Sequence, residues 1–171
     1  MTDRALEPRE IAAILRGMAR TVEAELLSLP REVASWHPAP GEWCALEAVG
    51  HLIESERHGF AGRIREVLAG KERLDTWDQE EVERARHDCD RDPADLVREF
   101  AAAREESARM VEGLRPEDLG KGGEHVDIGV LTVDDLLHEW VHHDRNHVKQ
   151  MMSAVQSRVW PHMGNCRKFS D

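Results

Sequence analysis

Four long segments of the chain carry apolar residues at steps of three and four, and stretches containing proline or glycine separate them. This spacing is typical of α-helices with one apolar face. We predict helices near residues 8–29, 42–69, 93–114 and 132–156, and a short surface helix within 80–87. Residues 115–131 predict a loop with a brief hairpin. The sequence therefore predicts an all-α fold, an antiparallel up-and-down four-helix bundle.

Length and composition are typical of one globular domain. The chain has 171 residues, of which 40% are hydrophobic and 33% charged, so we expect the bundle to occupy residues 1–160 and a polar C-terminal tail to follow at 161–171. There is no apolar run of about 18 residues, and the N-terminal segment is polar. We therefore expect a cytoplasmic protein with no membrane partner.

Charge and cysteine content exclude two further classes of protein. The net charge of −11 argues against a nucleic-acid partner, because phosphate contacts require a basic surface. The three cysteines are odd in number and widely spaced, which argues against a disulfide framework.

The most informative polar residues lie in the fourth helical segment. His143 and His147 are one turn apart and fall on its apolar half beside Trp140, so both imidazoles can reach one metal ion. His138 and His142 have the same spacing but fall on the polar half, where we expect them to be solvated. The alternative for His143 and His147 is a pair of core histidines that hydrogen bonds satisfy.

A third metal ligand has to come from another helix. The second helical segment offers His51 and His58, which are seven residues apart and therefore share a helix face. Spacing alone does not choose between them.

Two stretches of the chain resemble the signatures of the DinB-like (YfiT-like) family. The first is Trp36–Trp43, followed by a His-Leu pair that begins at His51. The second begins at Leu131 with a Thr-Val pair and ends in the H-x-x-x-H sequence His143–His147. The resemblance extends from about residue 10 to residue 155.

This resemblance implies a four-helix bundle that binds a divalent transition metal, commonly nickel or zinc, through three histidines. Position by position, the ligands would be His51, His143 and His147, so the resemblance favours His51 over His58. It also implies a homodimer and a metal-dependent transferase that adds a low-molecular-weight thiol to a small electrophilic substrate.

Two other functions stay open, namely a metal-dependent hydrolase and a non-catalytic structural or stress-related bundle that binds metal. The number of protein ligands separates the catalytic from the structural alternative. Three ligands leave a coordination position open, whereas a fourth ligand from Cys44, His58 or Asp144 would close a structural or sensing site.

The remaining polar candidates have weaker support. Asp144 is the one formally charged residue in the apolar half of the fourth segment, where it would either orient a ligand imidazole or form a structural ion pair. We expect His125 to be a surface loop residue. The sequence assigns no catalytic side chain.

Overall fold

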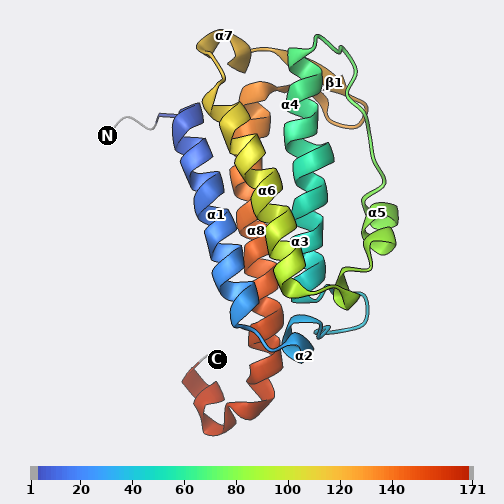
Figure 1. Ribbon diagram of the computed structural model, residues 1–171, viewed down its shortest axis with the longest axis vertical. Helices are drawn as coiled ribbons and strands as arrows, with labels where there is room; N and C mark the ends of the chain where they lie inside the picture. The colour runs from blue at the N-terminus through green and yellow to red at the C-terminus, as the bar shows by residue number, and fades with distance from the viewer. Residues whose placement is uncertain (1–3, 170–171) are drawn as a thin grey trace.

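Four long helices pack side by side in the computed structural model, which describes residues 4–169 apart from the side chain of residue 80 (Figure 1). They are α1 (Pro8–Ser28), α3 (Ala45–Glu54), α6 (Pro93–Glu112) and α8 (Val133–Val159). The second helix is longer than α3 alone, because a π-helical segment η1 (Ser55–Phe60) joins α3 to α4 (Ala61–Leu68). The predicted ends of all four helices agree with the structure to within three residues.

Short elements connect the long helices. Between α1 and α3 lies α2 (Arg31–Ala34), and between α4 and α6 lie α5 (Gln79–Arg86) and the 3₁₀ turn η2 (Asp88–Asp90). Helix α7 (Pro116–Leu119) precedes an antiparallel hairpin of β1 (Gly122–His125) and β2 (Gly129–Thr132). Beyond α8 the chain forms the turns η3 (Trp160–His162) and η4 (Gly164–Phe169). The short helix and the hairpin were both predicted.

Local sequence explains where the later helices begin. The Asp92 carboxylate accepts a hydrogen bond from the backbone N–H of Ala94 at 2.7 Å, and Pro93 occupies the first turn of α6. At α8 the Thr132 hydroxyl accepts from the backbone N–H of Asp135 at 3.1 Å, and the Asp135 carboxylate accepts from the backbone N–H of Thr132 at 2.9 Å. This capping box fixes the first turn of the helix that carries two of the predicted ligands.

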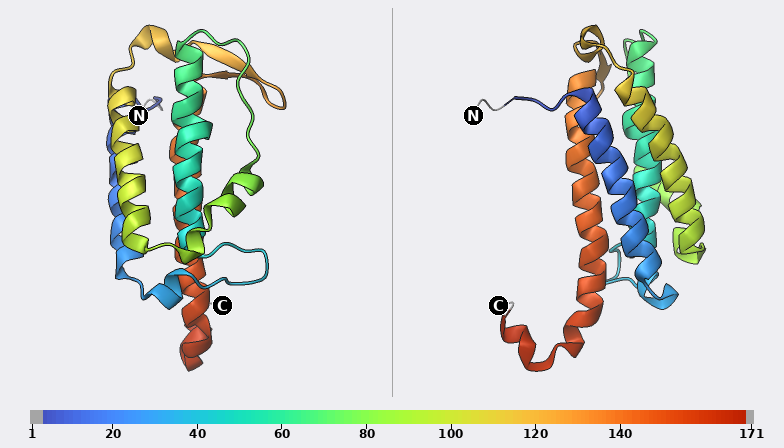
Figure 2. Two further views of the ribbon diagram at one scale, coloured as in Figure 1. Left: turned by 45° about the vertical axis from the view of Figure 1, so that its right-hand side comes forward. Right: turned by 60° about the vertical axis from the view of Figure 1, so that its left-hand side comes forward.

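The predicted apolar faces form the core. Trp140 is fully buried and Met151 is 1% exposed, so α8 presents the predicted face to the bundle. Met152 is 40% exposed although Met151 and Ala154 of the same turn are buried, because it lies about 100° round the helix from Met151 and outside the buried face. The last turns of α8 extend past the ends of the neighbouring helices (Figure 2).

The four-helix bundle is confirmed, but its chain order includes one long crossover in place of simple up-and-down connections. Helices α4 and α6 run in the same direction, because residues 69–92 return along the length of the molecule before α6 begins (Figure 1). The ion pairs Arg57–Glu99 and Arg65–Glu106 follow this parallel order. A connection of this length allows a crossover, which the helical periodicity does not reveal.

The crossover packs closely against α3 at Gly50. A Cβ atom on Gly50 would lie 1.7 Å from the Asp88 carboxylate, which Arg86 holds at 2.7 Å. Any larger residue at position 50 would push the crossover away from α3. This glycine therefore sets how closely α5 approaches the neighbouring residue, His51.

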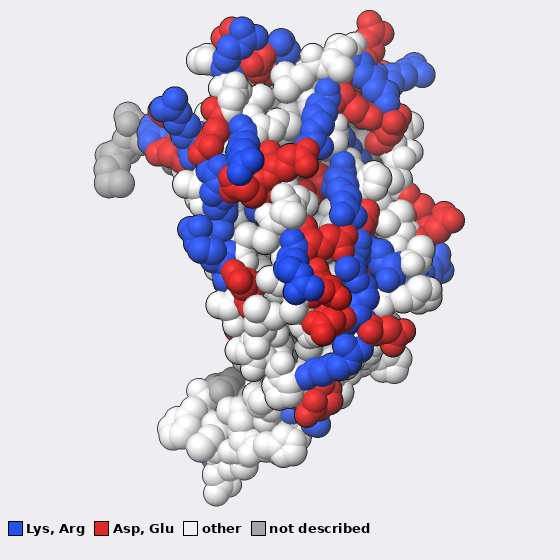
Figure 3. All heavy atoms as spheres, in the orientation of Figure 1, with Lys and Arg blue, Asp and Glu red and all other residues white. Residues whose placement is uncertain are grey.

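The surface is strongly but evenly charged on the face that Figure 3 shows, where basic and acidic side chains alternate over α1, α3 and α6. Arg16 of α1, for example, contacts both Glu105 and Glu112 of α6. Within residues 4–169, no helix has both the length and the apolar character needed to cross a membrane.

A buried ion network lies in the centre of the bundle. Arg104 of α6 donates to Glu56 of η1 at 2.7 Å and also to Asp144 of α8, and all three side chains are at most 2% exposed. Burial raises the pKa of Glu56 despite the attraction of Arg104, and the two carboxylates raise the pKa of Arg104 against the effect of burial.

We predict that Arg104→Met lowers the free energy of unfolding by about 3–5 kcal/mol, because it leaves two carboxylates buried without a cation. Urea unfolding measures this, and Arg20→Met on the exposed surface of α1 is the control, with a change below about 0.5 kcal/mol. Equal effects of the two substitutions would contradict a central role for the network.

Candidate metal centre

The structure brings His51 of α3 together with His143 and His147 of α8. One ring nitrogen from each lies within 4.8 Å of the other two. The Nε2 atoms of His51 and His143 are 3.1 Å apart, and the ring centre of His147 lies 4.2 Å from that of His51 and 4.4 Å from that of His143. The three imidazoles therefore converge on a space of the size that one metal ion requires.

Neighbouring acceptors orient two of the three rings. The Nδ1 atom of His51 lies 2.5 Å from a carboxylate oxygen of Glu83 on α5, and Nδ1 of His147 lies 3.0 Å from the side-chain oxygen of Gln150. An acceptor at Nδ1 fixes the proton there, which leaves Nε2 with a free lone pair for a metal. The Nδ1 atom of His143 is buried and has no hydrogen-bond partner within residues 4–169.

The π-helical segment separates the two histidines of the second helix. His51 is 2% exposed and faces α8. The side chain of His58 is 50% exposed, and it contacts Glu54 at 3.3 Å and Trp77 at a ring distance of 5.5 Å. The extra residue of a π-bulge changes the direction of the side chains that follow it, so the shared face predicted for these residues is wrong.

Burial keeps two of the imidazoles uncharged. Burial, together with the smaller effect of the neighbouring histidines, lowers the pKa of His143 to about 3 and that of His147 to about 4. An imidazole must be deprotonated to bind a metal. Both residues therefore have the protonation state of a ligand at neutral pH.

Each candidate for a fourth ligand has another partner. The Sγ atom of Cys44 lies 2.7 Å from that of Cys89, His58 pairs with Glu54, and Asp144 pairs with Arg104. Asp144 therefore forms the structural ion pair that was one of its two predicted roles. Among the histidine, cysteine, aspartate and glutamate side chains of the described part of the chain, only the three histidines come together at this centre. The Ser55 hydroxyl lies 3.2 Å from Nε2 of His51.

Two further histidine predictions have different outcomes. His142 is solvated as predicted, with a side chain that is 70% exposed. His125 is not a surface residue, because it is 8% exposed and its Nδ1 accepts a hydrogen bond from the backbone N–H of Asp127 at 3.3 Å. The tight turn of the hairpin folds the ring inward, which the loop-like composition did not indicate.

Comparison with known proteins identifies the family. A profile of the DinB superfamily matches residues 14–151. The chain belongs to the DinB superfamily.

A solved structure shares the fold of this chain. YfiT from Bacillus subtilis superposes with a TM-score of 0.80 over 91% of each chain, at 13% sequence identity. It is described as "a probable metal-dependent hydrolase with an unusual four-helix bundle topology". No curated protein sequence matches significantly.

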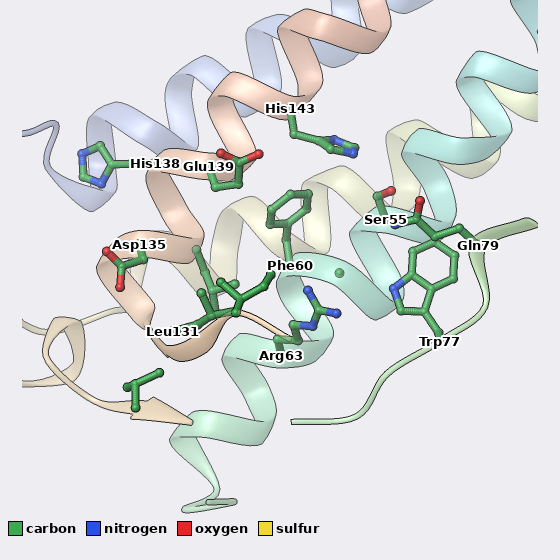
Figure 4. A pocket seen from close by; sticks show the side chains of 14 residues that line it. Ser55, Phe60, Arg63, Trp77, Gln79, Leu131, Asp135, His138, Glu139 and His143 are labelled. Atoms are coloured by element: carbon green, nitrogen blue, oxygen red, sulfur yellow. The ribbon is translucent and has the colours of Figure 1, made fainter. Parts of the chain in front are cut away.

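This DinB superfamily member has a pocket of about 820 Å³ beside the histidine cluster. Figure 4 shows His143 at one side of the pocket, with Phe60, Arg63 and Trp77 around it. The walls come from the second helix, the crossover, the hairpin and α8, and the lining residues are Ser55, Gly59, Phe60, Arg63, Trp77, Gln79, Ile128, Val130, Leu131, Asp135, Leu136, His138, Glu139 and His143. Of the three histidines, His143 lines this pocket, so a small molecule in the pocket can reach the edge of the cluster at His143.

Arg63 is the cation of this pocket that the sequence analysis missed. Its Nε atom is buried and has no hydrogen-bond partner within residues 4–169, and burial lowers its pKa. A guanidinium with a free donor in a pocket can bind an anionic group. Glu83 was missed as well, since a charged segment predicts only a surface helix until its docking against α3 is known.

The lowered pKa values of His143 and His147 predict a pH-dependent stability in metal-free protein. The unfolded chain binds protons near the ordinary value of 6.5, while the folded chain resists protonation to about 3 and 4. The free energy of unfolding should therefore fall between pH 7 and pH 5. Urea unfolding of chelator-treated protein measures this, and the fall should be smaller in His143→Gln and unchanged in His142→Gln. If the free energy of unfolding of His143→Gln falls as much as that of the wild type, a lowered pKa of His143 is contradicted.

Proposed function

We propose that this protein is a divalent-metal-dependent transferase that adds a low-molecular-weight thiol to a small electrophile. His51, His143 and His147 are the proposed ligands, and nickel or zinc is the proposed metal. The observation that carries the proposal is the open geometry of the centre, in which three imidazoles converge beside a pocket that His143 lines, with no fourth histidine, cysteine or carboxylate from residues 4–169.

The residues present fit a divalent transition metal. Three neutral imidazoles suit nickel and zinc, and the acceptors at Nδ1 of His51 and His147 orient these two rings as ligand imidazoles usually are. A bound divalent ion would supply Lewis acidity, which lowers the pKa of a coordinated thiol and makes it a nucleophile at neutral pH. No protein nucleophile is then required.

The surrounding side chains hold the three imidazoles in place. Glu83 fixes the His51 ring through Nδ1, and the ring of Trp43 packs 4.8 Å from His51 and 5.7 Å from His147, which shields that side of the cluster from water. Phe60 packs against His143 at 5.0 Å on the pocket side. These contacts hold the imidazoles rigid while leaving the pocket as the approach for an electrophile.

Arg63 supports a substrate with an anionic group. Arg63 lines the same pocket as His143, so a carboxylate that binds its guanidinium there would direct the rest of a small molecule toward the histidines. We therefore propose carboxylate-bearing electrophiles as the substrate class.

Hydrolysis is the second candidate, and Glu139 is the observation that favours it. This glutamate lines the pocket one turn before His143 and is 60% exposed, which suits a general base that accepts a proton from water. The description of YfiT as a probable metal-dependent hydrolase is consistent with this alternative.

The ligand assignment predicts that His147→Ala loses stoichiometric metal, because two imidazoles hold a divalent ion far more weakly than three. Elemental analysis after purification without chelators measures the metal content. His142→Ala, one residue before His143 but on the exposed face, should keep the ion. Equal loss in both variants would contradict the proposed centre.

The substrate class predicts a selective effect of Arg63→Met. In a thiol-consumption assay with the metal-loaded protein, KM for a carboxylate-bearing electrophile should rise about tenfold or more, since a charge-assisted hydrogen bond contributes about 1.5–3 kcal/mol. KM for the corresponding neutral amide should change little. A similar rise for both substrates would exclude Arg63 as the anion anchor, and no thiol consumption with any electrophile would favour hydrolysis.

We also propose that the protein is cytoplasmic and that it forms a homodimer. Sedimentation at micromolar concentrations tests the second, and a species of 19.5 kDa would contradict it.

A further inference from the structure

We propose that His37, Cys44, Glu47 and Cys89 form a second metal site, distinct from the three-histidine centre, that binds one zinc-like ion for structure and not for catalysis. One donor atom from each of the four residues lies within 4.8 Å of the others. None of the four takes part in the proposed function.

The donors come from separate parts of the chain that meet at the start of α3. Cys44 is the N-cap residue of α3 and Glu47 lies in its first turn, while His37 belongs to the preceding connection and Cys89 to η2 of the crossover. Nε2 of His37 lies 2.9 Å from the Glu47 carboxylate and 3.6 Å from Sγ of Cys89. The Sγ atoms of Cys44 and Cys89 are 2.7 Å apart.

The donor set has the chemistry of a closed zinc site. Two thiolates, one imidazole and one carboxylate make four ligands, and thiolate donors select zinc over the hard cations magnesium and calcium. Two sulfur ligands of tetrahedral zinc lie about 3.8 Å apart, so binding requires the two side chains to separate by about 1 Å. Cys89 lies in a three-residue turn and is only partly buried, which allows this adjustment.

A cation also resolves an electrostatic difficulty. Cys44 is fully buried, and burial raises the pKa of both thiols. Without a cation neither thiol ionises readily beside the other and beside Glu47. A divalent ion would stabilise both thiolates and would join the first connection, α3 and the crossover at one point.

This position links the second site to the first. Cys44 lies seven residues before His51 on the same helix, a rise of about 10 Å, and Cys89 follows closely after α5, which carries Glu83. An ion at the second site would therefore hold the crossover in the place where Glu83 contacts His51.

Cobalt(II) titration of the reduced apoprotein tests the proposal, because thiolate ligands produce a sulfur-to-cobalt charge-transfer band and imidazoles do not. Wild type should bind two equivalents and show the band. His147→Ala should lose one equivalent and keep the band, so failure of the histidine centre is measured separately. Cys89→Ser should lose the band and keep one equivalent, and Cys166→Ser, at an exposed cysteine outside the cluster, should match wild type.

His37→Ala provides a second variant that is expected to fold, since its side chain is 45% exposed. It should keep the band but weaken cobalt binding by more than about tenfold. The proposal is overturned if wild type shows no band, if Cys89→Ser retains it, or if His37→Ala binds as tightly as wild type. It is also overturned if intact mass shows Cys44 and Cys89 joined in a disulfide after purification under reducing conditions.

Discussion

The buried guanidinium of Arg104 is the interaction on which the arrangement of the bundle depends. It pairs with Glu56 in the π-helical segment and with Asp144 on α8, so three of the four long helices meet at one charge. Loss of Arg104 would leave two carboxylates buried without a cation in the core. Because Asp144 follows His143 directly and Glu56 lies five residues after His51, the same network sets the separation of α3 and α8 at the histidine cluster.

Periodicity and capping were sufficient to predict the helices and their approximate ends. Pro93 and Thr132 mark two helix starts through local chemistry that needs no tertiary information. The chain order was not predictable in this way, because the polar crossover has no long periodic signal and docks through tertiary contacts, among them the close approach at Gly50 and the contact of Glu83 with His51. The bundle could therefore be inferred from sequence while the direction of α6 could not.

The candidate metal centre was predictable only in part, because regular helical spacing holds in α8 but not in the second helix. His143 and His147 stand on the apolar half of a regular helix, where a wheel of 100° per residue is valid. The second helix contains a π-helical segment, so the wheel fails there, and only the family resemblance distinguished His51 from His58. Glu83 and Arg63 act through tertiary contacts that no local pattern encodes.

The central claim is that the three histidines hold a metal with a position open to an external thiol. X-ray absorption spectroscopy of the zinc- or nickel-loaded protein tests it most directly. The Cys89→Ser variant is used, so that Cys44 and Cys89 do not supply a pair of thiolate ligands at the second site. The account predicts imidazole nitrogens and light atoms alone before thiol addition, and one sulfur neighbour at about 2.3 Å afterwards. A fourth protein ligand, or a coordination shell that a saturating thiol leaves unchanged, would contradict it.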